Sequence, residues 1–227
     1  MIYAASDIHG CYEKYQRLLE RLRLSEDDTL YILGDLVDRG DGGMKLIKDL
    51  AGRKNVVCLC GNHDRDARLM LKTFAMPGDG YDEDRLQEDY QIWLADGGAV
   101  TYEDFLGLND RDKRLVLGFL GSLSYKKEVE AAGHRYLLAH TVPGKVKMLG
   151  DKPCPMFDYL FGKPDYDRRY YEDKTIVTGH TPTAFIDPAY KGRIWKGNGH
   201  IAIDCGAVFG YPLGCICLDT LEEIYVG

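Results

Sequence analysis

Three short apolar runs near the amino terminus each end in a cluster of polar residues. The runs are Ile2–Ser6, Leu30–Leu33 and Asn55–Cys60, and their length and composition predict buried β-strands. Between them, Tyr12–Leu22 has the i, i+3, i+4, i+7 apolar spacing of an amphipathic helix, and Met44–Leu50 predicts a second helix. This alternation predicts a βαβαβ unit with parallel strands and right-handed crossovers.

The polar clusters follow the predicted strands directly. Asp7 and His9 follow the first strand, Asp35 follows the second, and Asn62 and His63 follow the third. Parallel strands end at the same edge of a sheet, and open α/β sheets bind their ligands at that edge. We therefore predict that these side chains gather at one metal site. The alternative is three unrelated polar turns.

Residues 65–122 show helical patterns and no strand pattern. We predict helices over Arg65–Phe74, Asp82–Ala95 and Asp110–Leu120, with Asn109 as the cap of the last one. Together they form a helical insert of about residues 65–122. The insert contains the aromatic residues Tyr81, Tyr90, Trp93 and Tyr102. Their spacing is typical of helix-packing core, and a substrate wall is the alternative.

From residue 123 onward the pattern turns to strands. Tyr125–Glu130 and Arg135–Ala139 predict a hairpin, and Thr175–Thr178 predicts a further strand. The stretch 141–173 contains several prolines and predicts a long loop, a feature that is often functional. The tail, with apolar runs at Ile201–Ile203, Cys215–Leu218 and Glu223–Val226, predicts an antiparallel meander.

Length, charge and cysteine content limit the class of protein. A chain of 227 residues suits a single domain, 1–227, that includes the insert. Its net charge of −7 argues against broad binding of nucleic acid, which needs a basic surface. The chain contains no apolar run of about 18 residues, so we predict no membrane span. Seven cysteines, odd in number and widely spread, favour reduced thiols and a cytoplasmic location.

Six residues are candidate metal ligands, and each follows a predicted strand. They are Asp7, His9, Asp35, Asn62, His140 and His180. In an Asp-x-His sequence that leaves a strand, both side chains point the same way and can reach one ion. Asp35 can bridge two ions through its two carboxylate oxygens. Carboxylate, amide and imidazole donors without a thiolate suit two divalent cations, with Mn²⁺ as first choice and Fe or Zn²⁺ as alternatives.

Such a centre suits hydrolysis of a phosphoester. Two divalent cations, two carboxylates and one hydroxide leave a net charge of about +1, which attracts a phosphate anion. Hydroxide activated by the two metals attacks phosphorus. His63, next to Asn62, is the candidate general acid that protonates the leaving group, and Asp38 is the candidate that fixes its tautomer. Arg39 offers a planar fork that matches phosphate oxygens.

The motifs DIHG, GDLVDRG, GNHD and GHT, with a strand-end histidine at His140, resemble the ordered motif set of the calcineurin-like metallophosphoesterases. They are most similar to the bacterial and phage serine/threonine phosphoprotein phosphatases within that superfamily. The resemblance extends from Asp7 to Gly206. It implies an α/β fold of four layers, in which two mixed β-sheets pack together and are flanked by helices.

The same resemblance implies a role for each site residue. It implies that Asp7, His9 and Asp35 bind a first metal and that Asp35, Asn62, His140 and His180 bind a second. His63 matches the family's proton donor, Asp38 its partner, and Arg39 a phosphate-binding arginine.

Two positions depart from the family pattern. Asp64 replaces the glutamate of eukaryotic protein phosphatases, as it does in bacterial and phage relatives. The segment 161–163 occupies the place where those relatives supply a second phosphate-binding arginine. Lys163, Arg168 and Arg169 are therefore alternative candidates for completing the phosphate clamp.

The sequence therefore predicts a metal-dependent phosphomonoesterase. Its expected substrate is a protein phosphorylated on serine or threonine, or a small phosphoester. The alternative is a symmetrical dinucleoside tetraphosphatase, a nucleotide hydrolase of similar layout that typically has alanine at the position of Asp38 and lacks the threonine of Thr181. These two residues favour the protein phosphatase interpretation. A third alternative, a metal-free binding module with the same fold, conflicts with the complete ligand set.

Overall fold

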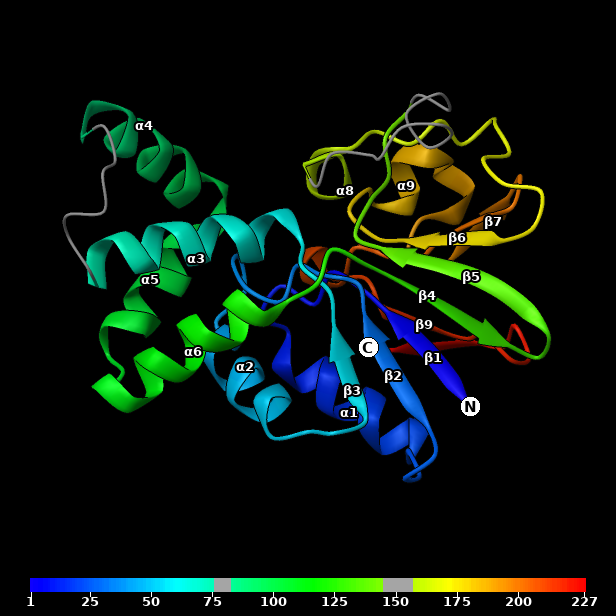
Figure 1. Ribbon diagram of the computed structural model, residues 1–227, viewed down its shortest axis with the longest axis horizontal. Coiled ribbons are helices and arrows are strands. Elements are labelled where there is room, and N and C mark those ends of the chain that lie inside the picture. Colours follow the sequence, from blue (N-terminus) through cyan, green and yellow to red (C-terminus); the bar gives the residue numbers. More distant parts are fainter. Residues whose placement is uncertain (76–82, 145–156) are drawn as a thin grey trace.

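The computed structural model describes residues 1–75, 83–144 and 157–227. Figure 1 shows two β-sheets stacked on each other, with α1 and α2 below the first sheet and the helices between β3 and β4 to one side. Tyr81, Asp82 and the centre of the predicted loop 141–173 lie outside the described ranges.

The first sheet contains the predicted βαβαβ unit. In spatial order its strands are β10 (Glu223–Val226), β9 (Leu213–Cys217), β1 (Ile2–Ala5), β2 (Thr29–Ile32) and β3 (Val56–Cys58). Strands β1, β2 and β3 are parallel, as the sequence pattern predicts, and helices α1 (Tyr12–Leu22) and α2 (Gly43–Ala51) connect them. Strand β9 runs antiparallel to both of its neighbours.

The second sheet also has five strands of mixed direction. In spatial order they are β4 (Lys126–Ala131), β5 (His134–Ala139), β6 (Thr175–Thr178), β8 (His200–Ala202) and β7 (Trp195–Gly197). The three central strands are parallel, and the two edge strands are antiparallel to their neighbours. The predicted class, an α/β fold with two mixed sheets packed together and flanked by helices, is confirmed.

The alternation of residues along each strand separates the layers. On β1, Ala4 packs between the two sheets, whereas Ala5 packs against the helices of the first layer. On β2, Tyr31 and Ile32 divide in the same way. Leu138 of β5 reaches the inter-sheet core from the opposite side. Because both faces of these strands are buried, their sequences are apolar at nearly every position.

Between β3 and β4 the described chain forms helices only. They are α3 (Asn62–Ala75), α4 (Glu83–Trp93), the π-helical turn η1 (Leu94–Gly98), α5 (Ala99–Leu106) and α6 (Asp110–Ser122). Helix α3 begins earlier than predicted, which places Asn62 and His63 in its first turn. The predicted cap of α6 is confirmed, because the Asn109 side chain accepts a hydrogen bond from the Asp112 amide at 3.0 Å. Helix α6 packs against α2 and α3.

Only short helices accompany the second sheet in the described ranges. They are α8 (Asp158–Phe161), α9 (Thr183–Ile186) and the 3₁₀ turns η2 (Pro188–Tyr190) and η3 (Ala207–Phe209). Tyr159 of α8 packs with Ala139 and Ile176 in a small apolar cluster. Among the helices that the structure describes, none combines the length and the apolar character required to cross a membrane.

The tail differs from the single antiparallel meander that the sequence predicts. Strand β8 pairs in parallel with β6 in the second sheet, whereas β9 and β10 pair with each other in the first. Ile201 and Ile203 face the inter-sheet core. Because burial of these two side chains is favourable there, β8 pairs within the second sheet and not with β9 and β10. Gly206 and Gly210, with φ of +81° and +87°, allow the chain to turn between the sheets.

Candidate metal centre

Strand ends from both sheets meet at one place in the fold. The first sheet supplies Asp7, His9, Asp35, Asn62 and His63, and the second sheet supplies His140 and His180. The segments approach so closely that a Cβ atom on Gly61 would collide with the Asp35 carboxylate, and one on Gly179 with the Asp7 carboxylate. Glycine at these two positions therefore allows the strand ends to converge.

The backbone at this convergence is strained. Ten non-glycine residues of the described chain have a positive φ, and six of them are predicted site residues. These six are Asp7, His9, Asp35, Asp38, Arg39 and His180, with φ between +44° and +71°. The left-handed region costs such residues about 1–3 kcal/mol each and is concentrated at functional sites. The strain therefore supports a functional role independently of the side chains.

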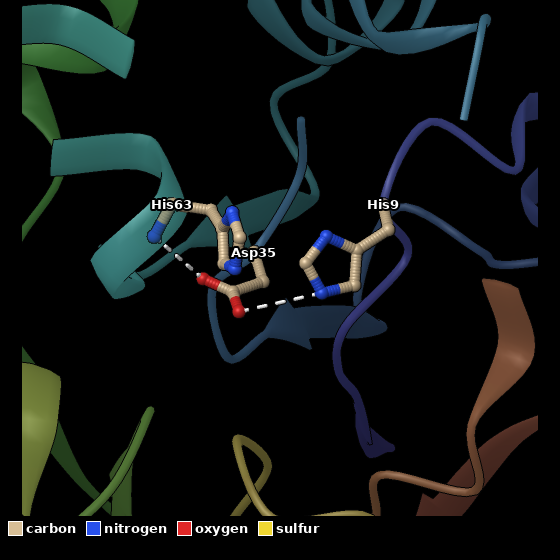
Figure 2. Close-up of side chains that lie close together, drawn as sticks. All are labelled: His9, Asp35 and His63. Carbon is tan, nitrogen blue, oxygen red and sulfur yellow. Dashed lines mark hydrogen bonds and ion pairs between the residues drawn. The ribbon is translucent and has the colours of Figure 1, made fainter. Parts of the chain in front are cut away.

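Two groups of ligand-type side chains share Asp35. Among the described residues, His9, Asp35 and His63 form one group, and Asp35, His140 and His180 form the other, with the ligand atoms of each group within 4.8 Å of one another. Figure 2 shows the Asp35 carboxylate beside the His9 and His63 side chains, whose rings contact each other edge to face with their centroids 4.7 Å apart. The Asp35 carboxylate also accepts a hydrogen bond from the His63 amide at 3.1 Å.

The protons of the first group show what it can bind. His9 Nδ1 donates to the Val37 carbonyl at 2.9 Å, because a carbonyl oxygen can only accept. The proton of neutral His9 therefore lies on Nδ1, and Nε2, which accepts a hydrogen bond from Arg39 Nη1 at 2.8 Å, also lies 3.4 Å from Asp35 Oδ2. Two electron-rich atoms at this distance repel each other unless a proton or a cation lies between them.

The second group has the same arrangement. His140 Nδ1 donates to the Leu33 carbonyl at 2.9 Å, so its Nε2 lone pair faces Asn62 Oδ1 at 2.9 Å and Asp35 Oδ2 at 3.5 Å. His180 Nδ1 lies 3.0 Å from both His140 Nε2 and Asn62 Oδ1. A single proton on His180 cannot satisfy all these acceptors. These ligand atoms therefore suit cations, and two groups of ligands that share one carboxylate are consistent with a dinuclear metal site.

Burial shifts the ionisable groups of the centre toward their neutral forms. It raises the pKa of the Asp7 and Asp35 carboxyls well above the usual range, and nearby carboxylates raise both further. It also lowers the pKa of His9 and His140 well below the usual range, so these imidazoles are neutral and can act as ligands. A bound cation favours the ionised carboxylates and the neutral imidazoles together.

Asp7 lies in the same region but belongs to neither group. Its carboxylate accepts hydrogen bonds from the His180 amide, at 3.1 and 3.0 Å, and from the Ser6 hydroxyl. Asp35 contributes to the raised pKa of Asp7, which places the two carboxyls near each other. The role of Asp7 as a ligand of the first metal remains a prediction.

His63 lies between an acid and an arginine. Its Nδ1 donates to Asp38 Oδ2 at 2.8 Å, as the sequence predicts, and its Nε2 accepts from Arg39 Nη2 at 2.9 Å. Arg39 Nη1 donates to His9 Nε2 at 2.8 Å. The arginine fork thus spans the two imidazoles.

The candidates for a second phosphate clamp differ in their surroundings. Two of them form ion pairs with nearby acids: Arg168 Nε lies 3.9 Å from Asp165 Oδ2, and Arg169 Nε lies 3.4 Å from Glu172 Oε2. Lys163 is exposed and is near enough that its charge, after burial and the charges of other cationic groups, contributes to lowering the pKa of His180 to about 4. The role of Lys163 in binding phosphate remains a prediction.

Three neighbours of the centre were not identified from the sequence. Trp93, predicted as packing core, is buried but also donates its indole N–H to Asp38 Oδ2 at 2.9 Å. Asp96 of η1 lies 3.1 Å from Arg39 Nη2 and 3.5 Å from His63 Nε2. Asp204 is buried beside Asp7, and burial raises its pKa to about 6.

Two of these residues left a signal in the sequence. Asp204 directly follows an apolar run, in the same pattern that identified Asp7. A tryptophan within a predicted packing cluster also needs an acceptor for its N–H when it is buried.

Asp64, noted only as a departure from the family pattern, accepts hydrogen bonds from the amides of Asp35, Leu36 and Gly61 at 2.8–2.9 Å. It therefore joins the second and third strand ends.

Comparisons with known proteins agree with this geometry. The family model for calcineurin-like phosphoesterases matches residues 1–184. The symmetrical bis(5'-nucleosyl)-tetraphosphatase of Legionella pneumophila (strain Lens) is 40% identical over 217 residues, which cover 88% of this chain and 74% of that protein. Shorter matches to other proteins of that name span about a quarter of their length, such as 23% for Nitrosococcus oceani, at 42% identity over 65 residues.

Two solved structures share the fold. A protein provisionally named a diadenosine tetraphosphatase has a TM-score of 0.65 at 18% identity, over 99% of this chain and 92% of that one. A serine/threonine phosphatase of Saccharomyces cerevisiae, similar to human PP5, has a TM-score of 0.58 at 14% identity, over 99% of this chain and 78% of that one. At these identities the likeness shows the fold alone.

Proposed function

Because this chain belongs to the calcineurin-like phosphoesterase family, we propose that it hydrolyses dinucleoside polyphosphates, cleaving a dinucleoside tetraphosphate into two nucleoside diphosphates. The observation that supports this substrate is the 40% identity, over 88% of the chain, to a protein named for that reaction. It favours the alternative of the sequence analysis over the phosphoprotein substrate that Asp38 and Thr181 suggest.

In this proposal the convergent strand ends hold two divalent cations. Their ligands would be Asp7, His9, Asp35, Asn62, His140 and His180, with Mn²⁺ as the first choice of metal. When bound, the cations supply Lewis acidity to phosphate oxygens and make a water molecule acidic enough to act as a nucleophile near neutral pH. Asp35, common to both groups, is the residue on which both cation positions depend.

Arg39 binds and orients the substrate phosphate. Its guanidinium now donates to the Nε2 atoms of His9 and His63. When it turns to a phosphate, His63 Nε2 is released and can hold a proton. Asp38 keeps the other His63 proton on Nδ1, so the protonated ring is oriented toward the leaving oxygen.

A second candidate function is a phosphomonoesterase that acts on serine or threonine phosphoesters. The observation that favours it is the buried Asp38–His63 hydrogen bond of 2.8 Å. A serine alkoxide is a far more basic leaving group than a nucleoside diphosphate, and it therefore depends more on a general acid. The presence of this pair is the reason to compare both substrates directly.

The test is a substrate comparison with the Mn²⁺-loaded protein. We expect diadenosine tetraphosphate to give ADP as its only nucleotide product, with kcat/KM above that for a phosphoserine peptide. Cleavage of the peptide alone would refute the proposal in favour of the second candidate. Release of ATP and AMP would refute symmetrical cleavage.

A further inference from the structure

A cavity of ≈ 580 Å³ opens beside the metal centre. Asp7, His9, Arg39 and His180 contribute to its lining, so a phosphate bound at the centre also borders the cavity. Ligand pockets for small molecules have volumes of roughly 300–1,000 Å³. The cavity is therefore large enough for the part of a substrate that extends beyond its reacting phosphate.

Two residues that line the cavity have exposed aromatic side chains. Phe185 of α9 is 82% exposed and Phe209 of η3 is 58% exposed, and both line the cavity. Pro182, Pro188 and Tyr211 line it as well. An exposed phenylalanine gains little from core packing, and aromatic rings grouped around a concave surface are typical of a binding site.

The loop that presents two of these rings is held in place. Lys14 of α1 donates to the carbonyls of Ala207 and Tyr211, at 2.8 and 2.6 Å. Both contacts fix the backbone on either side of Phe209. The wall is therefore largely formed before a ligand arrives, which lowers the entropy cost of binding.

The cavity is lined by two cationic side chains, Arg39 and Lys191, besides the buried carboxyls of Asp7 and Asp204. The Arg39 guanidinium lies 5.6 Å from the centroid of the Phe209 ring, which places a phosphate-binding group next to a stacking surface. Lys191, whose Nζ lies 5.0 Å from the Tyr211 ring, adds a second cation to the lining. A planar base with an anionic chain attached has the same sequence of properties.

We propose that this cavity binds the base of the substrate's nucleoside, with the base stacked against Phe209 and Phe185 while its phosphate chain reaches Arg39. This inference rests on the proposed function and extends it, since it identifies the residues that recognise the nucleoside. A peptide side chain is the competing occupant, and the experiment separates the two.

The experiment measures binding rather than turnover. Isothermal titration calorimetry of the Mn²⁺-loaded protein compares AMP with ribose 5-phosphate, which lacks only the base. Stacking of a base on aromatic rings predicts that AMP binds about tenfold to hundredfold more tightly. In Phe209→Leu and Phe185→Leu the ratio of the two dissociation constants should fall toward one, because leucine keeps an apolar side chain but has no ring.

Phe74→Leu is the matched control. Phe74 is also exposed, but it lies on α3, packs against Tyr90 and Tyr102, and is outside the cavity. It should keep the wild-type ratio. Equal affinity of the wild-type protein for AMP and ribose 5-phosphate would overturn the inference, and so would a base preference that survives both wall variants.

Failure of the inference can be distinguished from failure of the proposed function. If diadenosine tetraphosphate is cleaved but AMP has no advantage over ribose 5-phosphate, the cavity assignment is wrong and the reaction stands. If AMP is preferred through Phe209 but diadenosine tetraphosphate is not cleaved, the base site stands and the reaction is wrong.

Discussion

Trp93→Phe is expected to slow the hydrolysis of esters with basic leaving groups far more than that of esters with good ones. The indole N–H donates to Asp38 Oδ2 at 2.9 Å, and the same oxygen accepts from His63 Nδ1 at 2.8 Å. Asp38 is 0% exposed, and its Oδ1 has no hydrogen-bond partner among the described residues. Without the indole, His63 is the only side chain among the described residues that donates a hydrogen bond to this carboxylate.

The size of the effect follows from these contacts. A hydrogen bond to a buried charged group contributes about 1.5–3 kcal/mol. The smaller phenylalanine ring also leaves a void beside Tyr90 and Tyr102, which costs about 1–2 kcal/mol more in stability. If the hydrogen bond acts in the transition state through His63, its loss lowers kcat by about tenfold to hundredfold, since about 1.4 kcal/mol is a factor of ten.

The assay compares two phosphomonoesters on the Mn²⁺-loaded protein. A phosphoserine peptide has an alkoxide leaving group that requires protonation, whereas p-nitrophenyl phosphate releases a weakly basic phenolate. We expect kcat to fall by about tenfold or more for the first and by less than about threefold for the second. Tyr102→Leu is the control, because it disturbs the same aromatic cluster, and in the described part of the chain Tyr102 makes no hydrogen bond to Asp38.

Two results would refute this reasoning. Equal losses on both esters would show that Trp93 stabilises the whole site and not the proton donor. A leaving-group dependence in Tyr102→Leu as large as in Trp93→Phe would assign the effect to packing. In the background of Asp38→Ala, where the acceptor is already absent, Trp93→Phe should add no further leaving-group dependence.

Three further predictions address the metal centre and the stability of the fold. Asp35→Asn should reduce both the bound metal, measured by mass spectrometry, and the turnover of p-nitrophenyl phosphate by at least about hundredfold, because Asp35 is common to both ligand groups. Retained turnover would contradict its bridging role. His63→Asn should lower turnover of a phosphoserine ester by about 10²–10⁴-fold at unchanged metal content; a proportional loss of metal would instead make His63 a ligand, as its position in the first group allows. Burial lowers the pKa of His200 to about 3, whereas the same imidazole has a pKa of about 6.5 in the unfolded chain. The unfolded state therefore takes up the proton first, and the protein loses stability as the pH falls from 6.5 toward 3. The difference in free energy of unfolding between wild type and His200→Gln, measured in urea, should therefore narrow by about 2 kcal/mol between pH 7.5 and pH 5; a constant difference would show that His200 takes up its proton normally when folded.

The convergence of the centre could be predicted because its cause is local. A short apolar run followed by a polar cluster identifies a strand end, and parallel strands place their ends together. This reasoning placed Asp7, Asp35 and Asn62 after three parallel strands of one sheet, where the structure has them. Asn109 as a cap and the helical segments before β4 were predicted from equally local signals.

The features that could not be predicted from the sequence depend on packing between residues that lie far apart in the chain. Whether β8 joins the first or the second sheet is decided by which core Ile201 and Ile203 complete, and the apolar pattern is the same in either case. The orientation of Asp7 toward the His180 amide likewise depends on a loop 173 residues away in sequence. The contact of Trp93 with Asp38 requires the turn at η1, whose Gly97 has a φ of +103°.

Arg39 connects the two parts of the molecule that are expected to determine selectivity. On one side it contacts His63 and Asp96, which lie in the helical segments after β3. On the other side it lies over Phe209, in the loop that lines the cavity. Its ion pair with Asp96 is weak, because Asp96 is 59% exposed and such pairs contribute at most about 1 kcal/mol. A phosphate that offers two acceptor oxygens can therefore displace these contacts, and the same movement releases His63 to hold its proton. Binding of the substrate and release of His63 are thus coupled at Arg39, whose backbone is strained, with a φ of +71°.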